Sequence, residues 1–591
     1  MARLDYFAPG VYVEEVSRGS RAIQGINLSV AGFVGFTEDI RGDAELFEPI
    51  LITSWSQYLE NFAKVGSDGF TSFGAYLPFA VKGWFENGGG RCWVVSIGTQ
   101  LPLPDTTQRL PQAAENGATD ADSLPDAFTP IPTSGRRKSL TLRLQPEKEA
   151  EGRLKIFIEP DEPIPSSDPE EEPFDSGEYF KIRMISRDGD MHEFRHLTMQ
   201  DPDVVEDAAD RSAGVYVLNA ESETEALGET PVRLQDYVDI EITADPGLPL
   251  AQRPANGLFE VRPRPVRYRT REWYREMYGS PKRRTGVKGL FEIDEVAMIA
   301  CPDLMLVYQR GLLSLQGVHS VMEMMITNCE TAAPGPAYRM AVIDPPPVKP
   351  GKSDLPVLPE RQKPQDIEAW RMDSFGRFSP FAALYYPWLQ VPDPRNAGKP
   401  MTIPPCGHMM GLWCRTDESR GIHKAPANEI PRGVLGLAYE TNFREQEFLN
   451  PKGINCIRKF RNRGTLVWGA RTLAQLDDTD WRYVSVRRLM SYIAKSIEEG
   501  TQWAVFEPND EDLWARVTRT VKNFLERIWR QGALFGSTPE EAFYVKCDAE
   551  LNTPETMKLG QLFVEVGICP VRPAEFVIFR ISQWDQTQDA A

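Results

Sequence analysis

The sequence lacks the patterns that mark secreted, membrane-spanning and nucleotide-hydrolysing proteins. Its eight cysteines are scattered over 591 residues without a CxxC pair, which fits a reducing compartment better than a disulfide framework. No apolar run approaches the roughly 18 residues of a membrane span, and the opening MARLDYFAPG has no apolar signal-peptide stretch. No GxxxxGK[ST] phosphate loop occurs. We therefore expect a cytosolic, multidomain bacterial or viral protein without a signal peptide.

Positive charge is also scarce, since 66 Lys and Arg stand against 85 Asp and Glu, a formal net charge of −19. This balance argues against bulk nucleic-acid binding. Basic residues nevertheless gather between residues 453 and 510, a stretch without a nucleophile, metal cluster or phosphate loop. It predicts a hairpin of Ile454–Phe460 and Thr465–Gly469, then a helix capped by Ser485 that runs to Gly500. We interpret this stretch as a rigid binding surface for an acidic partner. Its basic residues are Arg458, Lys459, Arg461, Arg463, Arg471, Arg482, Arg487, Arg488 and Lys495.

A second basic stretch runs from Arg262 to Lys288 and is interleaved with aromatic residues. This composition permits a nucleic-acid-binding scaffold, because bases stack on aromatic rings and phosphates attract arginine. We favour a different interpretation, a linker whose charges meet acidic neighbouring subunits. The interleaved aromatic residues are Tyr268, Trp273, Tyr274 and Tyr278.

Two stretches separated by a long insertion predict an α/β core. The first contains strands near 29–36 and 92–97 around helices near 55–62 and 73–86. The second has a strand at 292–300, a helix at 317–327 and a strand at 338–344, a pattern that predicts parallel strands. Between them, a Pro-, Thr- and Asp-rich linker leads into short alternating strands with polar loops. We interpret residues 101–270 as an inserted β-rich domain that faces solvent.

The insertion contains His192-Glu193-Phe194-Arg195-His196, which matches the HExxH pattern of zinc metalloproteases. That chemistry requires a helix, where residues four apart project from one face. The flanking sequence predicts a strand, on which the two imidazoles would stand about 13 Å apart, too far for one zinc ion. We therefore interpret the match as chance, with a metalloprotease kept as an alternative.

Other potential catalytic or metal-binding residues lack the companions that they need. His319, His408 and His423 have no glycine-flanked serine elbow or matching aspartate motif nearby. Cys406, His408 and Cys414 lack a fourth ligand at a familiar spacing, so we expect core positions in a helix. We expect no catalytic residue, no metal and no cofactor.

The C-terminal part of the chain predicts a long amphipathic helix and a terminal strand. Asn509 or Asp510 caps the helix, and Gly532 ends it. Arg516, Arg519, Arg527 and Arg530 collect on the face opposite the apolar stripe. Apolar residues alternate or cluster near both chain ends, as in strands that pair with another chain. The arm residues that we expect between subunits are Val11, Val13, Val16, Phe576, Ile578, Phe579 and Ile581.

Several segments, in this order, resemble contractile tail sheath proteins of phage tails, R-type bacteriocins and extracellular contractile injection systems. Each segment is weakly specific alone, but the ordered set covers both ends and most of the last two thirds of the chain. The segments are PGVYVEEV (9–16), NGGGRCWVV (87–95), GIHKAPAN (421–428), WGARTL (468–473), WRYVSVRRL (481–489), VFEPND (505–510) and PAEFVIFRI (573–581).

The resemblance implies a multidomain fold of α/β and α+β parts. A subtilisin-like α/β core layer is expected with a C-terminal α+β sheath domain, an inserted all-β domain and extended terminal arms. The implied boundaries are an N-terminal arm at 1–25, a core at 26–100 and 271–445, an outer domain at 101–270, a tube-facing domain at 446–565 and a C-terminal arm at 566–591.

The resemblance also implies a function without catalysis. Many copies would polymerise as a helix or stacked rings around an inner tube protein, with baseplate and terminal cap proteins as further partners. Contraction would drive the tube through a target envelope, in a phage tail or an injection particle. Neither nucleic acid nor direct membrane insertion is implied. The tube-facing candidates are Arg516, Arg519, Arg527, Arg530, Arg487 and Arg488.

Overall fold

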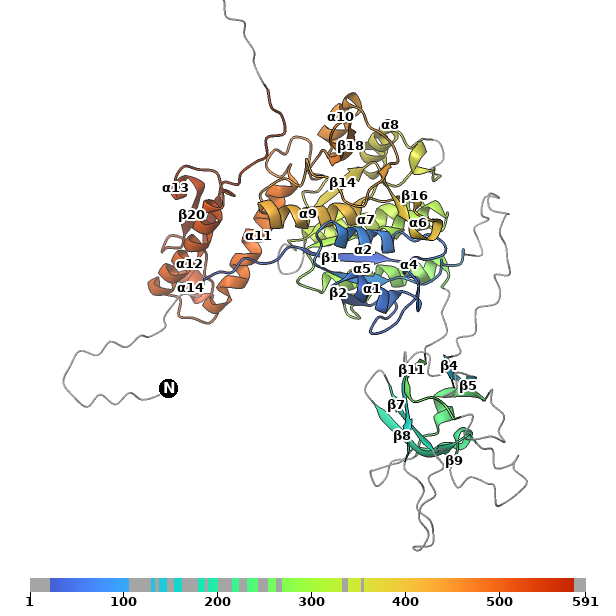
Figure 1. The fold of residues 1–591 in the computed structure, drawn as a ribbon. Helices are drawn as coiled ribbons and strands as arrows, with labels where there is room; N and C mark the ends of the chain where they lie inside the picture. The colour runs from blue at the N-terminus through green and yellow to red at the C-terminus, as the bar shows by residue number, and fades with distance from the viewer. Residues whose placement is uncertain are drawn as a thin grey trace, which may run out of the picture. The chain divides into compact units, whose positions relative to one another are not determined.

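The chain folds into two compact units in the computed structural model (Figure 1). Unit 1 comprises residues 1–110 and 267–591, and unit 2 comprises residues 111–266. No described helix has both the length and the hydropathy of a membrane span. The described residues are 22–105, 129–132, 138–145, 154–161, 179–186, 190–199, 215–222, 231–242, 253–261, 268–331, 338–351 and 355–578.

Unit 1 is built on an eight-stranded sheet with the order β19-β18-β14-β13-β12-β1-β3-β2. The inner strands are parallel, and the two edge strands are antiparallel to their neighbours. β1 and β14 are wholly buried, as expected of strands covered on both faces. The strands are β1 (Val30–Gly35), β2 (Pro49–Ile52), β3 (Arg91–Ser96), β12 (Met298–Ala300), β13 (Met340–Ile343), β14 (Ala382–Tyr386), β18 (Ile454–Phe460) and β19 (Gly464–Val467).

Helices cover the sheet, and two of them approach each other closely, α2 (Leu77–Glu86) and α9 (Cys406–Arg420). A Cβ on Gly407 would lie 2.3 Å from the Ala80 carbonyl oxygen, and one on Gly411 would lie 2.5 Å from the Trp84 carbonyl oxygen. Only glycine therefore permits this contact. The other helices around the sheet are α1 (Trp55–Phe62), α4 (Thr270–Tyr278), α5 (Gly286–Phe291), α6 (Asp303–Gln309), α7 (Leu315–Glu330), α8 (Pro364–Ala369) and α10 (Phe443–Leu449).

The core strand predicted at 292–300 is shorter in the structure, where β12 covers Met298–Ala300. Residues 292–296 form turns ahead of β12, where the Arg339 guanidinium donates to the carbonyls of Phe291, Ile293 and Val296 at 2.7–2.9 Å. The stretch after residue 379 forms β14 and then β15, which leaves the main sheet for a small antiparallel one. That sheet contains β15 (Leu389–Asp393), β16 (Lys399–Ile403) and β17 (Gly436–Leu437).

The C-terminal helices form a lobe with its own hydrophobic core, beside the sheet in Figure 1. The apolar stripe of α12 packs there with α11, a short antiparallel sheet and one residue from the other end of the chain, Ile23. The C-terminal lobe is defined as α11 (Val484–Thr501), α12 (Glu511–Arg530), α13 (Pro539–Ala542), β20 (Phe543–Lys546), α14 (Pro554–Lys558) and β21 (Glu565–Ile568).

The lobe begins later than the boundary expected at residue 446. The predicted hairpin exists, but β18 pairs in parallel with β14, so β18 and β19 extend the core sheet. The Ser485 cap is wrong, because α11 begins at Val484 and the buried Ser485 hydroxyl has no partner in the described structure. The Asp510 cap is confirmed, since its side chain accepts from the Leu513 N–H at 2.8 Å. β21 belongs to the lobe, so the expected C-terminal arm does not begin at residue 566.

Unit 2 contains two β-sheets that share one hydrophobic core. One has the order β11-β6-β7-β8-β9, and the other has the order β10-β5-β4. Buried and less buried residues alternate along β6 and β7, because only one face of each strand packs on the core. The strands are β4 (Thr129–Pro132), β5 (Lys138–Leu144), β6 (Leu154–Pro160), β7 (Phe180–Ile185), β8 (Met191–Thr198), β9 (Val215–Tyr216), β10 (Val238–Ile242) and β11 (Gly257–Val261).

Candidate functional site

The carboxyl edge of the parallel sheet is filled by side chains that serve the fold. Doubly wound sheets bind ligands where the strand order reverses, here beside β1 and β12. At that position the buried Asp303 carboxylate accepts from the N–H groups of Phe36 (2.7 Å), Tyr76 (2.5 Å) and Leu77 (3.3 Å), which fixes the start of α2. Burial raises the pKa of Asp303 to about 7, against the lowering effect of these N–H groups. Asp303 therefore acts as a cap from another part of the fold.

The side chains near Cys406 are core residues, as the sequence predicts. Asp344 follows β13 and accepts from the Cys406 N–H at 3.0 Å, at the start of α9. His408 is 2% exposed, its ring lies against Gly83, and burial lowers its pKa to about 4. Cys414 is also buried. Within the described ranges, no group of three or more His, Cys, Asp or Glu side chains is arranged to hold a metal ion.

The HExxH residues lie on a strand, as the sequence predicts. His192 and His196 both belong to β8, where the pairing with β7 shifts register near Phe194. His196 has a positive φ of 52°, and its N–H donates to Asp161 at 2.6 Å. His192 lies 3.4 Å from the Tyr237 hydroxyl. The helical geometry of a zinc protease is therefore absent from this segment.

The interpretation of Arg262 to Lys288 as a linker is wrong from residue 268 onward. Leu103 pairs with this segment through the Tyr268 carbonyl and the Thr270 N–H, at 2.9 and 2.8 Å. Trp273 is 1% exposed and stacks on Phe36. Its indole ring is therefore part of the core and not a platform for bases. Residues 262–267 lie outside the described ranges.

Arg488 is buried and Arg487 is half-buried, and both contact other parts of the chain. Arg488 is 3% exposed and forms two hydrogen bonds with Asp417 at 2.9 and 2.5 Å. Burial alone would lower the pKa of Arg488, but the Asp417 carboxylate raises this pKa above its ordinary value. The Arg487 guanidinium lies between the rings of Phe381 and Trp481, 4.5 and 4.2 Å from their centroids, and burial lowers its pKa to about 10. Both arginines join the C-terminal lobe to the core.

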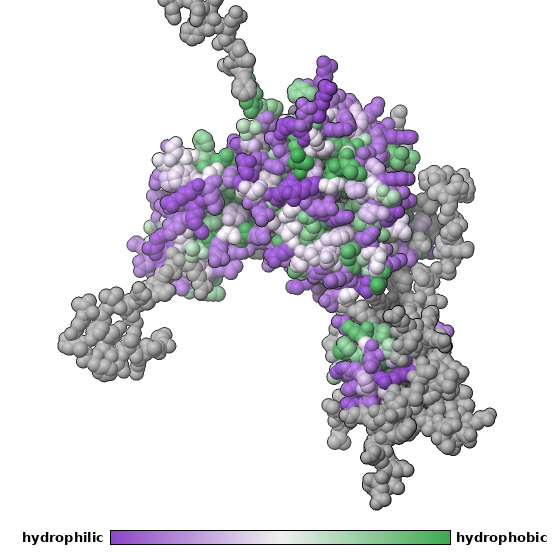
Figure 2. All heavy atoms as spheres, in the orientation of Figure 1, coloured by the Kyte–Doolittle hydropathy of each residue, from purple (hydrophilic) through white to green (hydrophobic). Residues whose placement is uncertain are grey.

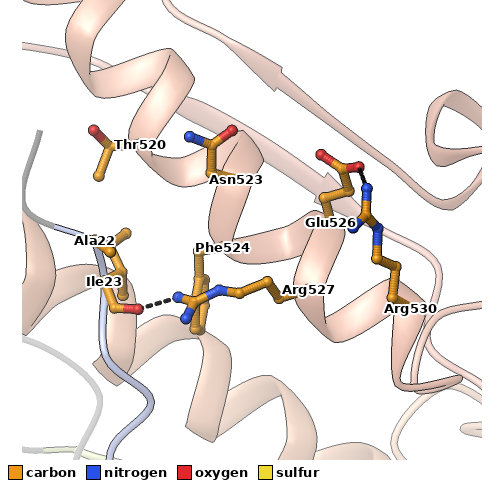
Figure 3. Close-up of a pocket in the computed structure, with 8 residues that line it drawn as sticks. All are labelled: Ala22, Ile23, Thr520, Asn523, Phe524, Glu526, Arg527 and Arg530. Carbon is orange, nitrogen blue, oxygen red and sulfur yellow. Dashed lines mark hydrogen bonds and ion pairs between the residues drawn. The ribbon is translucent and has the colours of Figure 1, made fainter.

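The four arginines of α12 differ in their surroundings. Arg516 pairs with Glu507 at 3.0 Å, and Arg530 pairs with Glu526 at 2.5 Å. Arg527 donates to the carbonyl of Ile23, at one end of an open cavity of about 340 Å³ (Figure 3). Arg519 is exposed and forms no hydrogen bond or ion pair with the described residues, so it has the fewest contacts of the four.

That Ile23 contact anchors the first described residues on the C-terminal lobe. Ile23 is 1% exposed, and its side chain fits against Gly500 of α11, where a Cβ would lie 2.6 Å from it. The Ile26 N–H donates to the Ser496 hydroxyl at 3.2 Å. The expected arm residues Val11, Val13 and Val16 lie outside the described ranges.

The other chain end contains a polar cluster that sequence reasoning missed. Glu575 accepts from Arg471 at 2.6–3.2 Å, from the Asn450 side chain at 2.6 Å and from the Tyr483 hydroxyl at 2.8 Å. Burial alone would raise the pKa of Glu575, but the hydrogen bonds from Arg471 and Asn450 lower this pKa below its ordinary value. Arg471 and Glu575 both belong to segments that suggested the resemblance, but nothing in their spacing indicated that they meet.

The next residues are exposed. Phe576, Val577 and Ile578 are 72%, 69% and 81% exposed. Hydrophilic side chains cover much of the C-terminal lobe on the face seen in Figure 2, so three adjacent exposed apolar residues are unusual there. Phe579 and Ile581 lie outside the described ranges.

Two family models match adjacent parts of the chain. The "phage tail sheath protein central domain" matches residues 375–473, and the "phage tail sheath C-terminal domain" matches residues 477–583. The junction falls between β19 of the core sheet and α11, where the C-terminal lobe begins. The C-terminal model therefore covers the C-terminal lobe, and the central-domain model covers the part of the core from β14 to β19.

Curated relatives carry the same description. The putative prophage major tail sheath protein of Pseudomonas aeruginosa (strain UCBPP-PA14) is 28% identical over 207 residues, 34% of this chain and 50% of that protein. The tail sheath protein of Escherichia phage P2 is 26% identical over 177 residues, 29% of this chain and 42% of that protein. The matched stretch thus spans half or less of each of these relatives.

Solved structures resemble the chain over nearly its whole length. The helical sheath of the anti-feeding prophage in the contracted state covers 98% of this chain and 99% of that chain, with a TM-score of 0.52. The sheath complex of the extracellular contractile injection system PVC in the contracted state covers 99% of each chain, with a TM-score of 0.51. Both are 20% identical to this chain, so the likeness concerns the fold.

Proposed function

Because the chain belongs to the phage tail sheath family, we propose that it is the structural subunit of a contractile sheath. Copies polymerise helically around an inner tube and contract to drive that tube through a target envelope. The observation that carries this proposal is the pair of adjacent family domains across residues 375–583. The contracted-sheath fold of similar solved structures supports it. In this proposal the chain is not an enzyme and needs no cofactor.

The partners are many copies of the same chain, an inner tube protein, a baseplate and a terminal cap, within a phage tail or a tail-like injection particle. Head-to-tail contacts that do not close produce a helical filament. The exposed Phe576–Ile578 segment supports an arm that reaches a neighbouring subunit. The expected N-terminal arm with Val11, Val13 and Val16 would form a second link between subunits.

The energy for contraction would come from the difference between two arrangements of the subunits. Rigid-body rearrangement of packed units is a common form of switching. A preference of about 1–2 kcal/mol per subunit, summed over many linked copies, strongly favours one state. The subtilisin-like topology expected of the core layer is part of this proposal. The parallel order β3-β1-β12-β13-β14-β18 supports a doubly wound layer of that general class.

We propose that the exposed arginines in the first half of α12 contact the inner tube. The change R516E/R519E should leave the unfolding temperature nearly unaltered, because exposed ion pairs contribute about 0–1 kcal/mol. The reversed charges should reduce sheath formation on purified tubes about tenfold or more, because rim charges set association with a complementary surface. Co-sedimentation with tubes and negative-stain microscopy measure this.

The matched control is R530E, because Arg530, like Arg516, pairs with a glutamate but lies in the last turn of the same helix. This variant should sheath tubes as the parent does. Normal sheathing by R516E/R519E would place the tube contact elsewhere. Formation of no sheath by the parent chain with tubes would contradict the proposed function itself.

The inserted unit should be dispensable for assembly. Leu103 already pairs with Tyr268 and Thr270, so a short Gly/Ser linker in place of residues 106–267 should close the gap without strain. We expect this variant to fold and to form sheaths, as judged by thermal unfolding and electron microscopy. A variant that folds with the parent's unfolding temperature but remains unassembled would assign unit 2 an essential role between subunits.

A further inference from the structure

Near each end of the chain, the described residues contact the part of unit 1 that is not adjacent to them in sequence. The N-terminal arm leads into β1 of the core, but the residues before β1 are seated on the C-terminal lobe. The C-terminal arm follows β21 of the lobe, but its first residues are held by the core. The N-terminal arm is therefore held by the C-terminal lobe, and the C-terminal arm is held by the core.

At the C-terminal end, the chain changes from the lobe to the core within a few residues. The Val571 N–H still donates to the Ala533 carbonyl of the lobe at 3.1 Å. Arg572 then pairs with Asp480 at 2.5 Å, and Glu575 enters the cluster around Arg471. We name the Glu575 cluster with Arg471, Asn450 and Tyr483 the C-terminal clasp.

The C-terminal clasp is connected to two strands of the main sheet, β18 and its neighbour β14. The Arg471 N–H donates to the Asn455 side-chain oxygen at 2.6 Å, and the Asn455 amide donates back to the Arg471 carbonyl at 2.8 Å. The same amide donates to the Leu384 carbonyl of β14 at 3.1 Å. Asn455 is wholly buried on β18. A force on Glu575 therefore reaches β18 and β14 through a short chain of buried hydrogen bonds.

At the N-terminal end, the equivalent contacts hold the chain on α11 and α12. The Arg527 guanidinium donates to the Ile23 carbonyl, and Ile23 is inserted in the core of the lobe. The Ile26 N–H is held by Ser496, and Gly25 lies against Tyr492, where a Cβ would meet the phenol oxygen at 1.8 Å. We name these contacts the N-terminal clasp.

We propose that the two clasps direct the pull of neighbouring subunits to opposite parts of the chain, the N-terminal arm to the C-terminal lobe and the C-terminal arm to the core sheet. This inference rests on the proposed function, because it assumes that neighbours hold the arms. Glu575 and Arg471 are then positioning residues. They make the core follow the C-terminal arm when the sheath contracts. Without the C-terminal clasp, the same pull would act on β21 and the lobe.

The test is E575Q in the full chain, with E565Q as the matched control. Glutamine keeps the shape and can still accept from Tyr483, but it removes the charge pair with Arg471. Glu565 is an exposed residue of β21 that accepts from Tyr544, outside the clasp. On unassembled protein, we expect chymotrypsin to cleave after Phe576 at least about tenfold faster in E575Q, because cleavage follows the population of the opened segment. E565Q should match the parent.

The second measurement is contraction. E575Q should assemble on tubes to the parent's extent but should remain extended, or contract incompletely, after a trigger that contracts parent sheaths. The variant R527M should retain the parent's cleavage after Phe576, because it affects only the N-terminal clasp. These readouts separate positioning from stability, since a purely structural role would lower the unfolding temperature and leave contraction intact.

Two results would overturn the inference. An unchanged cleavage rate in E575Q would mean that Glu575 does not hold the arm, and normal contraction despite faster cleavage would mean that the clasp does not transmit the motion. The cleavage assay does not depend on assembly. A parent chain that forms no sheath would therefore contradict the proposed function while leaving the clasp measurable.

Discussion

Removal of residues 576–591 is expected to abolish sheath assembly and leave a folded, soluble protein. The deletion begins just after Glu575, so the C-terminal clasp and every described contact of the lobe remain. It removes Phe576, Val577 and Ile578, which are largely exposed in the single chain. Burial of each such side chain by a neighbour contributes about 1.5–3 kcal/mol. Each subunit would lose the burial of several such side chains, and the other contacts of an ordinary interface would not replace that free energy.

Sedimentation velocity and electron microscopy with tubes measure the assembly of this truncated chain, and thermal unfolding measures its fold. A full-length control, F576S/V577S/I578S, separates the side chains from the backbone. It should also fail to assemble, because a strand with polar side chains loses the apolar burial but keeps its length. Normal sheaths from the truncated chain would mean that subunits are linked without the C-terminal arm.

The change R488A is expected to lower the free energy of unfolding of unit 1 by about 3–5 kcal/mol, because it leaves Asp417 buried without its partner. Arg488 is on α11, Asp417 is on α9, and the guanidinium also lies over the Trp413 ring at 5.2 Å. The pair therefore fastens the C-terminal lobe to the core. Chemical denaturation followed by circular dichroism measures the change.

Two variants make this prediction specific. R519A removes an exposed arginine of α12 and should change stability by less than about 1 kcal/mol. The double change D417L/R488L should recover much of the loss, because apolar residues of similar size often replace a buried ion pair without cost. If R488A behaves like R519A, the pair contributes no more than a surface contact.

Local signals were sufficient for the parts of the fold that depend on local chemistry. The turn between β18 and β19, the Asp510 cap and the apolar stripe of α12 each follow from residues close together in the chain. The tail sheath resemblance is confirmed by the family models and curated relatives. The strand around His192 was also predicted correctly, because the preceding strand β7 alternates buried and less buried residues and a turn leads from it into β8.

The sequence could not predict features that depend on contacts between residues far apart in the chain. Arg488 and Arg516 are both helical arginines, but Arg488 is buried against Asp417 of α9, while Arg516 pairs with Glu507 near the surface. The boundary at residue 446 was wrong because β18 finds its partner in β14, about 70 residues earlier, and no local pattern indicates that pairing. Arg527 is engaged by Ile23 from the other end of the chain.

The pairing of Leu103 with Tyr268 and Thr270 has a consequence for how such chains diversify. The two segments that flank the insertion pair with each other within unit 1, and we call this paired insertion point the socket. The hydrogen bonds of the socket do not depend on the sequence inserted between the two segments. Because the entropy of closing a loop rises only by about 0.6 kcal/mol per doubling of its length, modules of very different size can be exchanged at this socket. Homologous subunits can then acquire new outer decorations, and laboratories can attach reporters or antigens, without redesign of the polymerising body.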